Sequence, residues 1–113
     1  AERPAFDAVL AHPGTRIVGR FDDAVLLAMA TLHILPNLTF GGRPYALVDN
    51  VVTAPERRRE GHGRAVMEHV LALARGAECY KVMLLTGKRR NVRPFYEAVG
   101  FSAEAQWGMA VRY

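Results

Sequence analysis

Residues 46–64 read ALVDNVVTAPERRREGHGR, an extended apolar run that leads into an arginine- and glycine-rich turn. Amphipathic spacing predicts a helix directly after it, over about Arg64–Arg75, with Gly76 as its stop. A helix that begins at such a turn has backbone N–H groups without intrachain partners, and its dipole adds partial positive charge there. Gly61 and Gly63 would let a ligand approach the main chain closely. The stretch therefore predicts a cradle for a pyrophosphate.

Two widespread phosphate-binding motifs do not match this turn. A P-loop needs four residues between its glycines and then Gly-Lys-Ser/Thr, and a dinucleotide fingerprint needs Gly-x-Gly-x-x-Gly with an acidic residue about 20 positions later. The chain instead has Arg58-x-x-Gly61-x-Gly63, followed about thirty residues later by Phe95-Tyr96-x-x-x-Gly-Phe. These two motifs, in this order and at this separation, resemble the signatures of the GCN5-related N-acetyltransferases, the GNAT family. The resemblance covers about residues 45–113.

The chain is predicted to form one α/β domain over residues 1–113 with a sheet of mixed direction. Helix competes with strand over Val25–Ala30, and the turn at Asp22-Asp23 together with the resemblance favours strand. The family normally has one further strand and one or two helices before the first hairpin, so this amino-terminal part looks missing or shortened. The predicted elements are a helix end at Phe6–Ala11, strands at Thr15–Phe21, Ala24–Leu35, Tyr45–Thr53, Tyr80–Thr86 and Gln106–Tyr113, the helix from residue 64, and a short helix ending near Val99.

Composition narrows the class of protein. With 113 residues, half of them hydrophobic, the chain is long enough for one core of ordinary size. The longest apolar run, Ala24–Leu35, falls short of the roughly 20 residues that cross a bilayer, so no membrane partner is predicted. Cys79 is the single cysteine, which excludes an internal disulfide and favours a reducing cytoplasmic location. A small residue beside a buried strand is favoured over a nucleophile for Cys79.

The net charge of +4 invites a nucleic-acid interpretation, since a basic face can follow phosphates. The basic residues instead gather in two clusters, one at the predicted cradle and one before the second motif. Coenzyme A carries a pyrophosphate and a 3′-phosphate, so one anionic ligand between the clusters accounts for the charge, with solvated surface charge as the plain alternative for half of these residues. No nucleic-acid partner is therefore predicted. The clusters are Arg57, Arg58, Arg59 and Arg64, and Lys88, Arg89, Arg90 and Arg93.

The resemblance implies transfer of an acetyl group from acetyl-CoA to an amine. In the family, a bulge separates the strand equivalent to Asp49–Thr53 from the next parallel strand, and the pantetheine arm pairs with the main chain in that gap. Asn91 is implied as a further ligand, although it lies two positions closer to the motif tyrosine than usual, and helix capping is the alternative. The implied acetyl-CoA-binding residues are Val51, Val52 and Thr53 in the gap, Arg58, Arg59, Glu60, Gly61, His62 (through its backbone N–H), Gly63 and Arg64 at the pyrophosphate, and Asn91.

Two residues are implied as catalytic. Tyr96 matches the motif tyrosine and could protonate the departing thiolate, with aromatic packing beside Phe95 as the alternative. Asp49 lies on the strand that lines the gap and could accept the amine proton; a hydrogen bond within the loop is its rival role, and water could be the base instead. His33 could face the acceptor, although a packed core or edge histidine is favoured. No Cys, His and carboxylate set has metal-ligand spacing, so no metal is predicted.

The predicted function is N-acetylation of the primary amine of a small molecule. Acetylation of a protein or peptide amine is the alternative among enzymes. A module that binds acetyl-CoA without turnover, and a basic nucleic-acid binder, are the alternatives from other classes. The sequence leaves the identity of the acceptor and the formation of a homodimer open.

Overall fold

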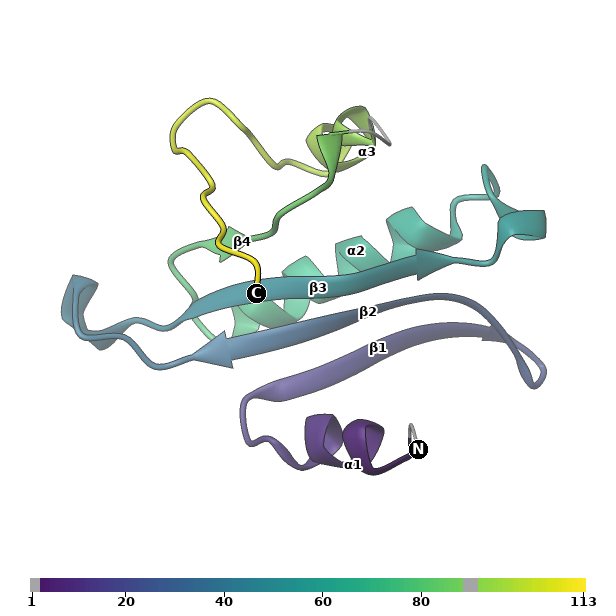
Figure 1. Cartoon of the computed structure of the whole chain (residues 1–113), viewed down its shortest axis with the longest axis horizontal. Coiled ribbons are helices and arrows are strands. Elements are labelled where there is room, and N and C mark those ends of the chain that lie inside the picture. The colour runs from purple at the N-terminus through teal and green to yellow at the C-terminus, as the bar shows by residue number, and fades with distance from the viewer. Residues whose placement is uncertain (1–2, 89–91) are drawn as a thin grey trace.

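The computed structural model describes residues 3–88 and 92–113, which form a four-stranded sheet with the order β1-β2-β3-β4 (Figure 1). The first three strands are antiparallel to one another in turn, and β4 is parallel to β3. This mixed sheet with helices confirms the predicted fold class. The elements are α1 (Arg3–Ala11), β1 (Thr15–Asp22), β2 (Val25–Leu35), the 3₁₀ turn η1 (Phe40–Gly42), β3 (Tyr45–Thr53), the 3₁₀ turn η2 (Pro55–Arg57), α2 (His62–Gly76), β4 (Val82–Met83) and α3 (Arg93–Ala98).

The strand β2 forms although part of its sequence favours helix. Residues 26–30 are mostly good helix formers, but β2 pairs with β1 on one side and with β3 on the other. A tight turn over Asp23 and Ala24, in which Asp23 has φ 52°, reverses the chain between β1 and β2. Two ladders satisfy the backbone on both sides, and this outweighs propensity differences of at most about 0.7 kcal/mol per residue. The predicted strand is therefore confirmed.

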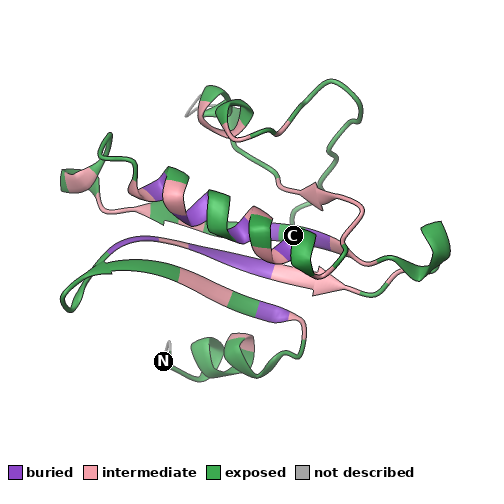
Figure 2. Cartoon of the chain, turned by 180° about the vertical axis from the view of Figure 1, so that it is seen from behind, coloured by how far each residue is buried: buried purple, intermediate pink, exposed green. Residues whose placement is uncertain are grey.

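The hydrophobic core lies between α2 and one face of the sheet (Figure 2). On α2, Val66, Met67, Val70 and Ala74 follow helical spacing and are all buried. Complete burial of a side chain such as Val70 contributes about 1.5–3 kcal/mol, so this face fixes the helix to the sheet. The strand residues of the core are Ala28, Ala30 and Leu32 on β2 and Ala46 and Val48 on β3.

The helices differ in how they are held. α2 packs across β1, β2 and β3, whereas α1 contacts β1 and contributes no buried residue. α3 also has no buried residue. Within residues 3–88 and 92–113, none of the helices combines the length and the apolar character needed to cross a membrane.

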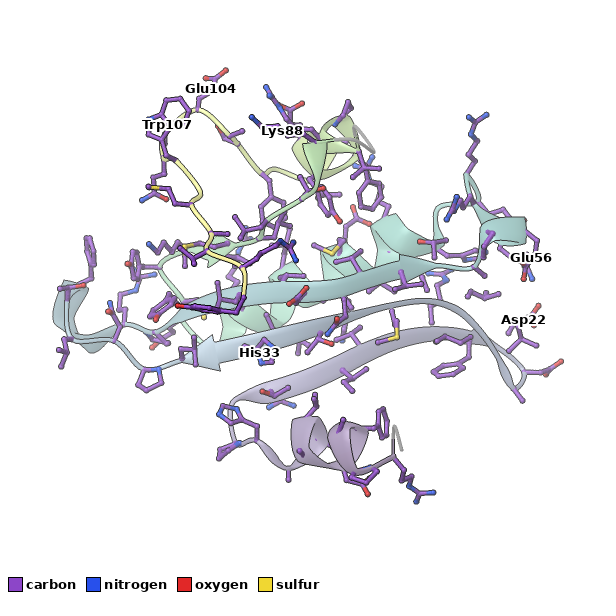
Figure 3. All side chains as sticks on the ribbon, in the orientation of Figure 1. Asp22, His33, Glu56, Lys88, Glu104 and Trp107 are labelled. Atoms are coloured by element: carbon purple, nitrogen blue, oxygen red, sulfur yellow. The ribbon has the colours of Figure 1, made fainter. Side chains whose placement is uncertain are left out.

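The predicted closing strand Gln106–Tyr113 is wrong. These residues have no regular secondary structure, and Figure 3 shows Trp107 on the returning segment, away from the sheet; its side chain is 93% exposed. A strand needs a neighbour, and no backbone hydrogen bond in the described part of the chain involves residues 106–113. Apolar alternation without a ladder partner therefore leaves this segment irregular and exposed.

The strand predicted over Tyr80–Thr86 is much shorter than expected. Only Val82 and Met83 pair with β3, opposite Ala46 and Leu47, and they are half-buried rather than buried. After Met83 the chain leaves β3 and leads to α3 (Figure 1), so the rest of the predicted strand does not pair with β3. This divergence creates the gap described next.

Candidate functional site

A bulge in β3 accompanies a gap between β3 and β4. The β2–β3 register shifts around Asn50, which has φ 54°. Because β4 pairs with Ala46 and Leu47 alone, the edge of β3 over residues 48–53 that faces β4 has no strand partner among the described residues. The bulge and gap have the form that the family resemblance implies. Along the free edge lie the predicted pantetheine-binding residues Val51, Val52 and Thr53.

The amino terminus of α2 presents backbone N–H groups that have no partner within residues 3–88 and 92–113. Gly61 is the N-cap, and the N–H of Ala65 donates to its carbonyl oxygen at 3.0 Å. No hydrogen bond of the described residues uses the N–H of His62, Gly63 or Arg64. These three unpaired donors therefore lie at the positive end of a 15-residue helix. This is a local structure that fits a pyrophosphate.

Gly61 and Gly63 have different roles in this loop. Gly61 has φ 86°, in the left-handed region, and a Cβ built on it would meet no atom within 4 Å. Gly63 is buried, and a Cβ on it would lie 2.8 Å from Thr53 Oγ1 and 3.4 Å from the Phe95 ring. Gly63 thus lets α2 pack closely on the end of β3. The open approach for a ligand, expected at both glycines, is present at Gly61 alone.

Ionic contacts brace the loop before α2. Arg57 Nε–H donates to Glu60 Oε1 at 2.8 Å, and Arg57 Nη1 lies 3.8 Å from Asp22 Oδ2 at the end of β1. His62 Nε2–H donates to the same Glu60 oxygen at 2.9 Å. The bond from Arg57, and then the bond from His62, lower the pKa of Glu60, and the bond to Glu60 raises the pKa of Arg57. Figure 3 shows Asp22 and Glu56 at the same end of the sheet, where these contacts join the β1–β2 turn to the loop.

The sequence alone does not reveal the tie between Asp22 and Arg57. These residues are far apart along the chain and carry no motif. The ion pair between Arg57 and Glu60 does leave a signal in the sequence, because the two residues are three positions apart, a spacing at which opposite charges meet in a helical turn. The ion pair between Arg57 and Asp22 depends on where the β1–β2 turn lies after folding.

The ring of His62 has a bracing role in addition to the predicted role of its backbone N–H. The side chain is 12% exposed, and its Nδ1 is the one buried side-chain nitrogen or oxygen without a hydrogen bond in the described part of the chain. Because Nε2 carries the hydrogen donated to Glu60, the ring restrains the carboxylate. The backbone N–H of His62 has no hydrogen bond with any described residue at the start of α2.

Two arginines at the loop are available to an anion. Arg58 and Arg59 are exposed and make no ion pair with any described residue. Arg64 instead pairs with Glu68 one turn along α2, with Nε and Oε2 3.4 Å apart. Arg58 and Arg59 are therefore better placed than Arg64 to add charge at the helix start. Outside the described residues lie Arg89 and Arg90 of the second basic cluster and the predicted ligand Asn91.

Tyr96 lies in α3 between two aromatic rings. Its ring meets Phe95 and Phe101 edge-on, with centroids 5.1 and 6.1 Å apart. Gly100, with φ 113°, ends the turn so that the N–H of Phe101 returns to the carbonyl oxygen of Tyr96 at 3.1 Å. The second motif thus builds an aromatic cluster that packs on the core and sets the orientation of the Tyr96 ring. Packing and a role for the phenol as an acid are compatible here.

Asp49 is exposed and takes part in the bulge. Its Oδ1 accepts the N–H of Asn50 at 2.8 Å, and the Asn50 amide donates to Thr31 Oγ1 at 3.2 Å. Thr31 is buried directly opposite Asp49 on β2. The bond from the Asn50 N–H corresponds to the local hydrogen bond that the sequence suggests as the alternative to a role for Asp49 as the base. The second carboxylate oxygen makes no hydrogen bond with the described residues, so an amine could still reach it.

A hollow among the described residues lies away from these site residues. It has a volume of about 760 Å³ and lies between β1 and α2, with Arg16, Arg20 and His69 among its lining residues. It contains none of the predicted site residues. On its outer side the hollow is bounded by β1, which pairs with β2 alone among the described residues.

Comparisons with known proteins agree on one family. The profile described as Acetyltransferase (GNAT) family matches residues 1–101. A glucosamine 6-phosphate N-acetyltransferase of Trypanosoma brucei brucei is 36% identical over 92 residues, and the match covers 81% of this chain and 55% of that protein. The chain thus spans about half the length of this curated relative.

Solved structures give the same result. A provisionally assigned acetyltransferase from Agrobacterium tumefaciens str. C58 is 46% identical with a TM-score of 0.92, over 97% of this chain and 76% of that one. An acetyltransferase of Trypanosoma brucei is 28% identical with a TM-score of 0.82, over 97% of this chain and 77% of that one. With the bulge, the gap and the open start of α2 in place, the chain belongs to the acetyltransferase (GNAT) family.

Proposed function

We propose that this chain is an acetyl-CoA-dependent N-acetyltransferase that acts on the primary amine of a small molecule. The proposal rests on the meeting of two features at one end of β3, its free edge and the unpaired N–H groups of α2. A diphosphate at α2 would direct the arm attached to it along the edge of β3. Coenzyme A has its groups in this order, a diphosphate followed by an amide-containing arm that can pair with a strand.

The reaction is aminolysis of a thioester. The amine nitrogen forms a bond to the carbonyl carbon, the carbon–sulfur bond breaks, and the sulfur leaves with the electron pair. A backbone N–H near Val51 or Val52 would stabilise the oxyanion. Tyr96 supplies a proton to the sulfur, and the proton lost by the amine goes to Asp49 or to water. The protein's share is thus one main-chain donor and one acid, with Asp49 as the base where water does not take that role.

The favoured acceptor is an amino sugar phosphate. The Trypanosoma brucei brucei relative, 36% identical to this chain, is named for glucosamine 6-phosphate. The exposed carboxylate of Asp49 beside the bulge suits an ammonium group that approaches the thioester. Structural relatives below 25% identity share the fold and do not discriminate among acceptors.

Two measurements test separate parts of the proposal. Isothermal titration measures acetyl-CoA binding, and release of free thiol with glucosamine 6-phosphate as acceptor measures turnover. Asp49→Asn should lower turnover most at low pH, because less free amine is present there to replace the action of a base. A pH–rate profile of the same shape and height in both proteins would favour water as the base. Binding without thiol release from any amine in a panel would indicate a binding module, and absence of binding would overturn the proposal.

A further inference from the structure

A cluster of three polar side chains lies apart from the site described above. Thr15 of β1 and His33 of β2 are paired strand residues, and His12 lies in the turn between α1 and β1. Thr15 Oγ1 is 2.9 Å from His12 Nδ1 and 2.8 Å from His33 Nδ1. The two rings are edge to face, with centroids 6.5 Å apart. One buried hydroxyl therefore joins two imidazoles.

This cluster shares a face of the sheet with Asp49. Ala30 and Leu32 of β2 belong to the core beneath α2, so Thr31 and His33 point to the opposite face. Thr31 is paired with Asp49. His33 lies two residues further along β2, a step of about 7 Å along a strand. Figure 3 shows His33 near the end of β2, opposite to the end that carries Asp22.

This separation decides what His33 can do. A general base must lie within hydrogen-bond reach of the amine or one water away from it. At about 7 Å along the strand from the Asp49 position, His33 is too distant to share an amine bound there. It is well placed to contact a second polar group of the same acceptor, several bonds from the amine.

The number of hydrogens in the cluster limits its states. The Thr15 hydroxyl has one hydrogen to donate. When both rings are neutral, one Nδ1 accepts that hydrogen and its ring carries a hydrogen on Nε2, while the other ring donates from Nδ1 and has a bare Nε2. The neutral cluster thus offers one outward N–H. Uptake of one proton gives it two outward N–H groups and a positive charge.

Both outward nitrogens can reach a ligand. Neither Nε2 of His12 nor that of His33 has a hydrogen-bond partner among the described residues. Among the described residues that are not exposed, His62 Nδ1 is the one buried side-chain nitrogen without a hydrogen bond, so the Nε2 of His33 is not enclosed. His12 is exposed and His33 half-buried. The cluster therefore faces solvent through its donors.

The surrounding groups match the two ends of a zwitterionic acceptor. His33 is paired with Thr15 of β1 and with Leu47 of β3. Asp49 and Tyr45 lie two residues on either side of Leu47, so they are on the same face of the sheet as His33. Arg16, next to Thr15, lines the hollow beside α2. Asp49 is thus the charged strand residue nearest to His33 on this face in the described chain, and it suits an ammonium group. The imidazoles suit an anion.

We propose that His33 and His12, held by Thr15, bind the phosphate of an amino sugar phosphate acceptor and take up one proton as they do so. This inference rests on the proposed acetyltransferase function, because it assigns the far end of the same acceptor. Hydrogen bonds from a charged imidazole to a phosphate are stronger than neutral ones. Binding of the phosphate should weaken as pH rises, because a neutral imidazole lacks the charge and the second outward N–H that the protonated cluster offers.

The kinetic test compares glucosamine 6-phosphate with glucosamine as acceptors. The parent protein should prefer the phosphorylated acceptor at pH 6 and lose part of that preference by pH 8.5. His33→Gln should lower the ratio of the two kcat/KM values by about tenfold or more, the size of one charge-assisted hydrogen bond. Thr15→Val should lower it less, and Thr15→Ser should match the parent. His69→Gln, on the other face of the sheet, is the matched control and should leave the ratio unchanged.

A titration with inorganic phosphate, followed by NMR of the histidine rings, does not depend on turnover. The His12 and His33 signals should move and take on the protonated position, while those of His69 stay. If neither acceptor is acetylated but these signals respond, the proposed function fails and the phosphate subsite stands. If acetylation proceeds with the same acceptor ratio in a folded His33→Gln protein, or the signals ignore phosphate, the subsite is overturned and the function stands.

Discussion

α2 and α3 each carry one of the two sequence motifs, but they are held in different ways. α2 has 15 residues with five buried, and Met67 and Val70 are fully enclosed. α3 has six residues with none buried and is positioned through Phe95, Tyr96 and Phe101. The proposed contribution of α2 is main chain, which any correctly packed helix presents. The proposed contribution of α3 is the phenol of Tyr96. Removal of one oxygen atom should therefore lower activity in α3, whereas in α2 the loss of packing should lower stability.

For α2, the substitution Met67→Ala should have the largest effect of all, and it should act on stability. Met67 is fully buried in the core, so its loss should lower the free energy of unfolding by about 2–5 kcal/mol. Chemical denaturation measures this. Met109→Ala is the control, because Met109 is 88% exposed and its removal should change stability little. Equal losses in the two variants would show that α2 does not anchor the fold.

Tyr96→Phe should act on turnover rather than on stability. The ring and its contacts with Phe95 and Phe101 are kept and one O–H is removed, so kcat should fall by about 10²-fold or less with acetyl-CoA affinity nearly intact. Single-turnover kinetics and isothermal titration measure the two quantities. An unchanged kcat with chemistry rate-limiting would make the tyrosine structural. A joint collapse of affinity and Tm would show that the phenol holds α3 in place.

Gly63→Ala should act through packing although it lies in the cradle. Its Cβ would lie 2.8 Å from Thr53 Oγ1, and overpacking of this kind costs about 1–3 kcal/mol. Thr53→Ala in the same protein removes the obstructing atom and should restore part of the stability. A loss of acetyl-CoA affinity in Gly63→Ala with no loss of stability would mean that this glycine faces the ligand.

Arg58→Gln should weaken acetyl-CoA binding by about two- to fivefold, the usual range for an exposed charge. The effect should shrink as salt is added, because salt screens exposed charges. Arg75→Gln, in the last turn of α2, is the matched control at the far end of the helix. Isothermal titration at two ionic strengths gives both comparisons. Equal losses in Arg58→Gln and Arg75→Gln would remove the loop from the binding site.

Glu60→Gln should have the smallest effect and a defined pH dependence. The Glu60 pKa is lowered by Arg57 and then by His62, so the tie is present above the ordinary carboxyl range, near pH 4.5, and is lost as pH falls through the lowered value. The variant should therefore lose a little Tm at pH 7, and the difference from the parent should disappear in acid. A difference that grows as pH falls would show that Glu60 is not stabilised as an anion.

The sequence predicts well those elements that depend on residues close together along the chain. β1, β2, β3 and α2 follow from local periodicity and turn residues, and the structure confirms them within a few positions. The predicted strand at Gln106–Tyr113 is wrong and β4 is short, because a strand also needs a partner ladder, which no local pattern contains. The cradle is indicated by Arg58, Gly61 and Gly63, but the roles of the two glycines separate only in three dimensions.

What the sequence determined by itself is the pair of motifs, the start of α2 and the family to which they point, because each depends on residues a few positions apart. The tertiary structure decided which glycine is open to a ligand, where Asp22 braces Arg57, and how Thr15 contacts both His12 and His33, the latter 18 positions away from it. The reason is strand register. Pairing Thr15 with His33 and Thr31 with Asp49 arranges distant side chains on one face, and register is set by the whole sheet packing on α2.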